Sequence, residues 1–250
     1  MSILSAEGKR IIKKLVDYNG SVFHHKSMSD GYLRTIKNNA PPKKYKKSQF
    51  YLGSKLIIRH PITAQHIWAE TDYRVDYSNL NQYVAKLNRQ INNYFVSQSY
   101  EALESYLYSV AAKICLKNRK AAVEIKNIIK CADTASFRKH LKDKWRSTNE
   151  LYTRVIIKLL PEMDTFIREN PSFKNYGFFL EVLLKARHSI THNEGIIAID
   201  DVKDKKAKEY LIDFFGKYNS KPTMQIDCTE HAHEIIGTIA KIVHLIEHFL

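Results

Sequence analysis

The chain has 250 residues, of which 44% are hydrophobic, and it carries a formal net charge of +14. This length and apolar content suffice for a substantial buried core, while no apolar run approaches the roughly 20 residues of a membrane-spanning helix. The three cysteines (Cys115, Cys131 and Cys228) are odd in number and show no CxxC spacing, which argues against a disulfide or zinc scaffold. Because residues 1–14 lack the pattern of a secretory signal, we expect a cytoplasmic protein that makes no contact with a membrane.

The positive charge is concentrated at the beginning of the chain. Residues 1–60 contain 13 Lys or Arg and 3 Asp or Glu, a net charge of +10, and the rest of the chain contributes +4. Such a region attracts polyanions, of which nucleic acid is the most common. The stretch PPKKYKKSQFY interleaves tyrosines with basic residues, which suits phosphate contacts and base stacking on a single strand. The candidate nucleic-acid-binding residues are Lys43, Lys44, Lys46 and Lys47; the alternative is a solvated cationic surface without a ligand.

The first 75 residues contain mixed secondary-structure signals. Apolar residues on one face predict a helix over residues 3–17. The prolines and repelling charges of residues 38–47 predict a loop, and the β-branched residues of 50–60 suggest a short strand. We therefore expect a small basic N-terminal lobe over residues 1–75.

From residue 76 onward the sequence is predominantly helical. Apolar residues recur every three or four positions over 77–96 and 99–118, and the series continues over 119–131 and 134–144. STNE at 147–150 is a capping-box pattern at the start of the next helix, which Pro161 is expected to kink and Asn170-Pro171 to end.

The last 80 residues contain two further helices and a strand pair. The helix that carries KARHSITHNEG buries a stripe at i, i+3, i+4 and i+7, and Asn193–Gly195 supplies its stop. Residues 195–200 and 223–227 are expected to pair as short strands on either side of a helix at 203–215. DCTE at 227–230 resembles a second capping box and precedes a helix whose core residues are Ile235, Ile239, Val243 and Ile246.

The segment RHSITH brings Arg187, His188 and His192 to the end of an apolar helix. This arrangement resembles the motif of the HEPN superfamily (higher eukaryotes and prokaryotes nucleotide-binding): Arg, a polar residue, and His four to six residues after the Arg. The similarity covers roughly residues 76–250 and rests on a short motif in a helical context. It implies a mainly α-helical bundle, often dimeric, with metal-independent ribonuclease activity in toxin and defence members, and therefore no cofactor and no metal.

The residue types suit that chemistry. Cleavage of RNA by its own 2′-hydroxyl needs a base for that proton and a cation to offset the charge on the phosphorane. His192 titrates near neutrality and can act as the base or the acid, and Arg187 remains charged and forks onto phosphate oxygens. His188 could orient His192, bind phosphate or transfer a second proton. Residues five apart on a helix point about 140° from each other, so Arg187 and His192 converge only if the last turn distorts or a second protomer completes the site.

The arginine and histidine residues also have other interpretations. Arg187 and His188 could be solvated residues while His192 caps the helix end. The histidines of the last helix (His231, His233, His244 and His248) suggest metal binding, but HEIIG lacks the second histidine of a zincin, so polar-face histidines are favoured. No GxGxxG, GxxxxGK[ST] or GxSxG motif occurs.

The sequence therefore predicts a mainly α HEPN-like helical bundle over residues 76–250, with a small basic N-terminal lobe and at most a few short strands. The expected function is a metal-independent endoribonuclease that acts on RNA as a homodimer, with a cognate antitoxin or defence protein as a further partner. The alternative is a non-catalytic HEPN-like module for nucleic-acid binding or dimerisation.

Overall fold

The computed structural model describes residues 4–38, 49–59, 66–76, 80–117, 133–144, 147–215 and 222–250. These described residues fall into two compact units, one within Met1–Phe23 and Ile91–Leu250 and the other within His24–Gln90. Two long helices, α1 (Ala6–Asn38) and α2 (Leu80–Lys117), contribute residues to both units. Whether residues 1–75 fold as a lobe of their own stays a prediction.

The smaller unit contains a long β-hairpin and the adjoining parts of the two helices. Strands β1 (Gln49–Arg59) and β2 (His66–Asp76) pair in antiparallel fashion along their whole length, from Gln49 opposite Asp76 to Arg59 opposite His66. The helical parts are joined by a small apolar cluster (Leu33, Leu80, Tyr83 and Val84) and by a hydrogen bond of 2.8 Å from Ser29 Oγ to Asn88 Oδ1. The strand suggested at residues 50–60 is confirmed, and its partner β2 was not predicted.

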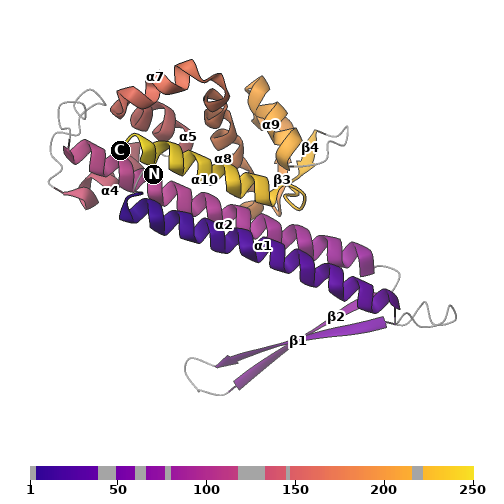
Figure 1. Ribbon diagram of the computed structural model, residues 1–250. Helices are drawn as coiled ribbons and strands as arrows, with labels where there is room; N and C mark the ends of the chain where they lie inside the picture. The colour runs from indigo at the N-terminus through magenta and orange to yellow at the C-terminus, as the bar shows by residue number, and fades with distance from the viewer. Residues whose placement is uncertain are drawn as a thin grey trace. The chain divides into compact units, whose positions relative to one another are not determined.

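The larger unit is a bundle of helices. Its elements after α2 are α4 (Thr134–Lys144), α5 (Thr148–Glu150), the π-helical segment η3 (Leu151–Ile156), α6 (Ile157–Leu159), α7 (Pro161–Glu169), the 3-10 helix η4 (Pro171–Asn175), α8 (Tyr176–His192), β3 (Ile196–Ala198), the 3-10 turn η5 (Ile199–Asp201), α9 (Lys205–Phe215), β4 (Thr223–Gln225) and α10 (Ala232–His248). The chain is therefore mainly α, as its sequence predicts (Figure 1).

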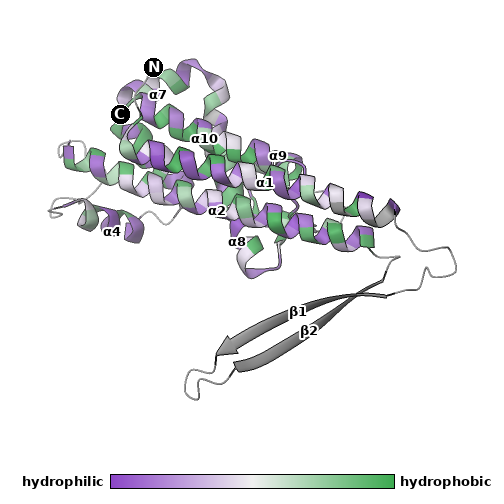
Figure 2. Cartoon of the chain, turned by 60° about the horizontal axis from the view of Figure 1, so that its bottom comes forward, coloured by the Kyte–Doolittle hydropathy of each residue, from purple (hydrophilic) through white to green (hydrophobic). Residues whose placement is uncertain are grey.

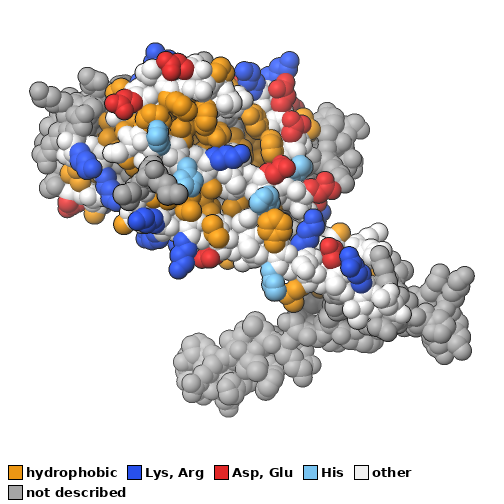
Figure 3. Space-filling view, viewed as in Figure 1, with side chains coloured by type: hydrophobic (Ala, Val, Ile, Leu, Met, Phe, Trp, Pro, Cys, Tyr) orange, Lys and Arg blue, Asp and Glu red, His pale blue; other side chains and the backbone are white. Residues whose placement is uncertain are grey.

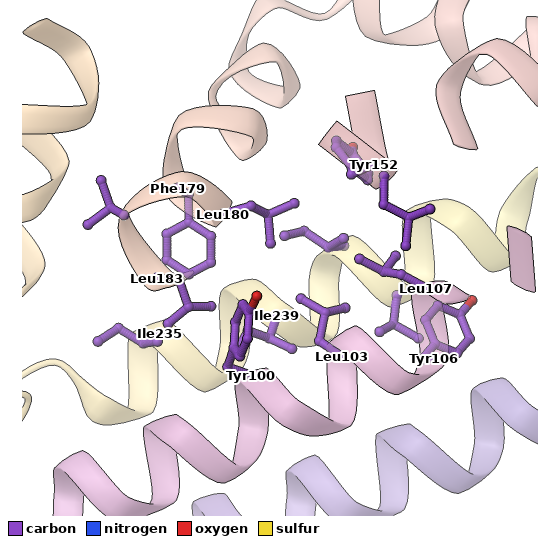
Figure 4. Packing of buried hydrophobic residues seen from close by; sticks show 14 of the residues in the cluster. Tyr100, Leu103, Tyr106, Leu107, Tyr152, Phe179, Leu180, Leu183, Ile235 and Ile239 are labelled. Atoms are coloured by element: carbon purple, nitrogen blue, oxygen red, sulfur yellow. The ribbon is translucent and has the colours of Figure 1, made fainter. Parts of the chain in front are cut away.

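The core of this unit lies where α2, α8 and α10 meet (Figure 4). Leu103 and Leu107 of α2 and Leu180 and Leu183 of α8 are all fully buried and belong to one packed cluster. The inward residues of α10 (Ile235, Ile239, Val243 and Ile246) are fully buried as expected. Hydrophobic and hydrophilic residues alternate along these helices (Figure 2), so each buries one apolar stripe and exposes its polar face.

The first part of α1 runs antiparallel to both α2 and α10 (Figure 1). At its start, the carboxylate of Glu247 on α10 accepts hydrogen bonds from Ser5 N at 2.7 Å, Ser5 Oγ at 2.8 Å and Tyr106 Oη at 2.7 Å. Glu247 is only 6% exposed. A buried carboxylate is costly unless it is hydrogen-bonded, and these three donors therefore make Glu247 the connection between α10, α2 and the start of α1.

Prolines and turns divide the helices where the sequence indicates. α7 begins at Pro161, whose missing N–H is not needed in a first turn, and Asn170-Pro171 separates α7 from η4. The predicted strand pair is confirmed, since β3 and β4 are antiparallel with Ile196 opposite Gln225. No helix in the described ranges is both long enough and apolar enough to cross a membrane.

Several predicted details are wrong. The helix expected over 3–17 extends to Asn38, and the helices expected over 77–96 and 99–118 are one continuous helix, α2. Neither capping box forms: Ser147 makes no side-chain capping bond, and Asp227 accepts from Thr229 N at 3.0 Å in a turn that ends before α10. The helix expected over 119–131 lies outside the described residues.

Candidate functional site

The candidate residues lie on the last two turns of α8, whose inner face is locked into the core. Phe179, Val182, Leu183 and Ala186 are at most 2% exposed, and Ile190 packs against them. This stripe fixes the rotation of the helix about its own axis. It leaves Arg187 partly exposed and places His188 and His192 at the solvent-facing surface.

The end of α8 is defined by a backbone turn. The carbonyl of Ser189 accepts hydrogen bonds from Asn193 N at 2.9 Å and Gly195 N at 2.8 Å. Glu194 and Gly195 take positive φ angles of 53° and 79°, a left-handed region that favours glycine. A Cβ at Gly195 would lie 2.7 Å from Gln225 Nε2, the end of a flexible side chain that can shift, so it is the backbone conformation that favours glycine there.

A buried amide holds this turn in place. Asn93 of α2 is 6% exposed, donates from Nδ2 to Ile226 O at 3.0 Å, and accepts from Cys228 N at 3.0 Å. Ile226 N in turn donates to Gly195 O at 2.7 Å. Asn93 therefore positions the segment that stops α8 directly after His192. The one signal for it in the sequence is an Asn pair inside an apolar helix, and Asn93 was not predicted from it.

Arg187 lies against α2 and forms an ion pair there. Its Nη2 donates to Glu101 Oε1 at 3.1 Å, and the two side chains are 30% and 43% exposed. Its Nε is buried and has no hydrogen-bond partner within the described part of the chain. Because both groups are partly solvated, the ion pair contributes at most about 1 kcal/mol to stability. Most of the donor capacity of the guanidinium thus remains unused by Glu101.

A second carboxylate, Glu104, contributes to the field around Arg187. Burial raises the pKa of Glu104 above its ordinary value, although Arg187 and Lys142 act in the opposite direction. Tyr100 donates to Glu104 Oε1 at 3.5 Å and also contacts the Thr148 hydroxyl. Burial likewise raises the pKa of Tyr100, so this phenol remains a neutral hydrogen-bond donor. Glu101 and Glu104 were not predicted as site residues, because each lies more than 80 residues before Arg187 in the chain.

The two histidines form a ring pair. The ring centroids of His188 and His192 are 4.8 Å apart, and the rings are inclined by 47°. This contact follows from the i, i+4 spacing on a regular helix. No hydrogen bond links either ring to Arg187, and α8 remains α-helical through His192. Arg187 and His192 therefore still point about 140° apart, and the structure brings together the two histidines but not the arginine with His192.

The predicted nucleic-acid-binding lysines, Lys43, Lys44, Lys46 and Lys47, lie outside the described residues. On the face of the larger unit seen in Figure 3, basic and acidic side chains are interspersed with histidines. Two of the four histidines at the start of α10 and on it have hydrogen-bond partners: His231 pairs with Glu234, and His233 contacts Asn19 and the Phe23 ring. Within the described ranges, no three His, Cys, Asp or Glu side chains gather as potential metal ligands.

In comparisons with known proteins, the chain matches no family model, no curated protein and no solved structure. The resemblance to the HEPN superfamily therefore rests on the Arg187–His192 motif and its helical setting.

Proposed function

We propose that this chain is a metal-independent endoribonuclease of the HEPN toxin or defence kind. The observation that carries the proposal is the end of α8, where a rigid helix presents one incompletely bonded guanidinium and two exposed imidazoles. The apolar stripe of α8 and the turn that Asn93 holds in place fix the position of these groups, and neither of them binds the guanidinium or the imidazoles. Such preorganised polar groups at a surface are what catalysis of phosphoryl transfer needs.

The proposed reaction is attack of a ribose 2′-oxygen on the adjacent phosphorus. His192 accepts the 2′-hydroxyl proton as the 2′-O–P bond forms, and Arg187 stabilises the charge that develops on the phosphate oxygens. The P–O5′ bond breaks, and the leaving 5′-oxygen takes a proton, for which His188 beside His192 is the candidate donor. The products are a 2′,3′-cyclic phosphate and a free 5′-hydroxyl.

The divergence of Arg187 and His192 favours a two-fold homodimer. If two copies of the end of α8 face each other, an Arg from one protomer and a His from its partner can flank one phosphate. Ile196, which is 45% exposed directly after this helix end, supplies apolar surface next to the proposed axis. A cognate antitoxin or defence protein that covers this face is the further partner we expect in the cell.

A non-catalytic module for nucleic-acid binding or dimerisation is the second candidate, and the Arg187–Glu101 ion pair favours it. That contact gives Arg187 a structural reason to be present. It gives none for His192, which makes no hydrogen bond to the helix end within the described ranges. The two candidates therefore differ in what they require of His192.

The test is RNA cleavage by the full chain in the presence of EDTA. The proposal predicts cleavage that leaves 2′,3′-cyclic phosphate ends and that His192→Ala abolishes. A matched control is His244→Ala, since His244 is also exposed but lies on α10. Loss of wild-type cleavage on EDTA addition would refute the metal-independent mechanism, and wild-type activity in His192→Ala would refute the assignment.

The shared site is tested by mixing two inactive variants. If each site takes Arg from one protomer and His from the other, Arg187→Ala mixed with His192→Ala regains part of the activity, because heterodimers contain one intact pair. If each protomer supplies its own pair, mixing restores nothing. A chain that cleaves RNA while its measured mass is that of a monomer contradicts the dimer.

The basic segment is tested through the salt dependence of RNA binding. Contacts to phosphates release counterions, so the slope of log K against log salt changes by about 0.7 for each contact to a single strand. Reversing the charges of Lys43, Lys44, Lys46 and Lys47 together should flatten this slope without changing cleavage of bound RNA. An unchanged slope would place the RNA-binding surface elsewhere.

A further inference from the structure

A cleft lies beside His188, between the end of α8 and the segment formed by β3 and η5. It has a volume of about 590 Å³, within the range of roughly 300–1,000 Å³ that is usual for small-molecule sites. The His188 ring lines the cleft and also contacts the His192 ring. Whatever occupies the cleft therefore lies next to the proposed catalytic histidine. A second cavity, near Lys113 and Glu247, includes none of the candidate residues.

The walls of the cleft are partly apolar and suit a flat ring. Leu184 of α8 and Ile196 of β3 line it, and Ile196 is 45% exposed. An unstacked base is recognised by contacts of its faces with aromatic or apolar side chains together with hydrogen bonds to its Watson–Crick edge.

Two charged groups in the lining have no partner among the residues that the structure describes. The carboxylate of Asp201 and the ammonium of Lys203 make no hydrogen bond or ion pair there, although both line the cleft. Their neighbours are already engaged: Lys185 Nζ donates to the Asp201 carbonyl, and Asp200 pairs with Lys208 at 3.1 Å. Among the Asp and Lys side chains of the lining, the carboxylate of Asp201 and the ammonium of Lys203, two residues apart in the chain, are thus free to bind a ligand.

These groups select among the bases. An ionised carboxylate only accepts hydrogen bonds and an ammonium only donates them. Guanine presents two adjacent donors, N1–H and the N2 amino group, beside the O6 acceptor. Uracil has a single N–H between two carbonyl groups, and adenine and cytosine place an acceptor next to their one amino group. Guanine alone among the four bases offers two adjacent donors, one for each oxygen of a carboxylate, together with an acceptor for an ammonium.

We propose that this cleft binds a guanine base of single-stranded RNA, with Asp201 accepting from N1–H and the N2 amino group and Lys203 donating to O6. The proposal deepens the proposed function, on which it rests for the RNA substrate, by adding a preference for the base next to the cleaved phosphate. It does not depend on catalysis, because the base can bind whether or not the phosphate is cleaved.

The experiment measures binding of short RNAs that cannot be cleaved. Tetranucleotides with 2′-fluoro sugars and a single guanine, adenine, cytosine, uracil or inosine among uracils are titrated with the full chain. A well-formed pair of hydrogen bonds to a base edge gives roughly tenfold discrimination or more. We expect the guanine strand to bind about tenfold more tightly than the uracil strand, and the inosine strand, which lacks the N2 amino group, to lose part of that gain.

Asp201→Asn is the decisive variant, because an amide offers both a donor and an acceptor to the same edge. It should lose the guanine preference, whereas Asp213→Asn, the same change on an exposed residue of α9 outside the cleft, should keep it. Equal binding of all five strands by the wild type, or a preference that survives in Asp201→Asn, overturns the proposal. A guanine preference without any cleavage of natural RNA refutes the proposed ribonuclease and leaves the guanine site standing; cleavage without the preference does the reverse.

Discussion

Two charged residues on helices of the same core, Glu247 and Arg187, differ in how completely the protein uses them. Glu247 is 6% exposed, and three donors of its own chain surround its carboxylate. Arg187 is 30% exposed, has one carboxylate contact, and keeps a buried Nε without a partner in the described part of the chain. Buried polar groups are normally satisfied, so the fold accounts for Glu247. In Arg187 the buried Nε has no partner in the described part of the chain, and the exposed part of the guanidinium has donors that the fold does not use.

The largest effect on stability is expected for Glu247→Ala. The change leaves the buried Tyr106 hydroxyl without its acceptor, which costs about 1–3 kcal/mol, and it also removes the part-buried hydrogen bonds from Ser5. We expect the free energy of unfolding to fall by about 2–4 kcal/mol in urea titrations. Glu230→Ala, at an exposed position just before α10, serves as the control and should change it by no more than about 0.5 kcal/mol. Equal effects of the two changes would contradict the structural role of Glu247.

Gly8→Ala should have the next largest effect. A Cβ at Gly8 would lie 2.4 Å from Glu247 Cδ and within 2.7 Å of both carboxylate oxygens, and this carboxylate cannot move without losing its donors. We expect a loss of about 1–3 kcal/mol. Gly20→Ala in the same helix has open space around the new Cβ and should stabilise the protein by about 0.5–1 kcal/mol, because alanine favours helix over glycine. If both substitutions changed the free energy of unfolding in the same direction, the close packing of Gly8 against Glu247 would be contradicted.

The smallest expected effect is on the pH dependence of the free energy of unfolding. Because burial raises the pKa of Glu104, the folded state holds this proton to a higher pH than the unfolded state does. Between the pKa of Glu104 in the unfolded state and its higher pKa in the folded state, the unfolded state binds fewer protons. The contribution of Glu104 to the free energy of unfolding therefore falls as the pH rises. Glu104→Gln should remove this fall and gain stability relative to the wild type as the pH rises above about 4.3, the ordinary pKa of a glutamate. A constant difference between the two chains as the pH rises would show that Glu104 titrates alike in both states.

Periodic patterns predicted those parts of the fold in which one face of an element is buried. The stripe from Phe179 to Ile190 and the Asn193–Gly195 stop specified α8, and the β3–β4 pair followed from short apolar segments around a helix. The continuity of α2 was missed because its middle buries polar residues: Asn92, Asn93, Ser97 and Ser99 are at most 6% exposed. In the sequence these residues resemble a break between helices.

Only part of the candidate site could be predicted from the sequence, because some of its residues come from another helix. Arg187, His188 and His192 are close in the chain, so spacing on a helix predicts their directions. Glu101, Glu104 and Asn93 reach the same helix end from α2 through tertiary contacts, which no local pattern encodes. The sequence motif therefore identified Arg187, but nothing in the sequence indicated the carboxylate with which Arg187 pairs.

The most direct test of the contrast between Glu247 and Arg187 is a paired measurement on Arg187→Ala, of RNA cleavage and of the free energy of unfolding. If the reaction needs Arg187 but the fold does not, the variant should cleave RNA at least about a hundredfold more slowly than the wild type. Its free energy of unfolding should change by no more than about 1 kcal/mol. Cleavage at the wild-type rate, or a loss of stability as large as that of Glu247→Ala, would contradict the account.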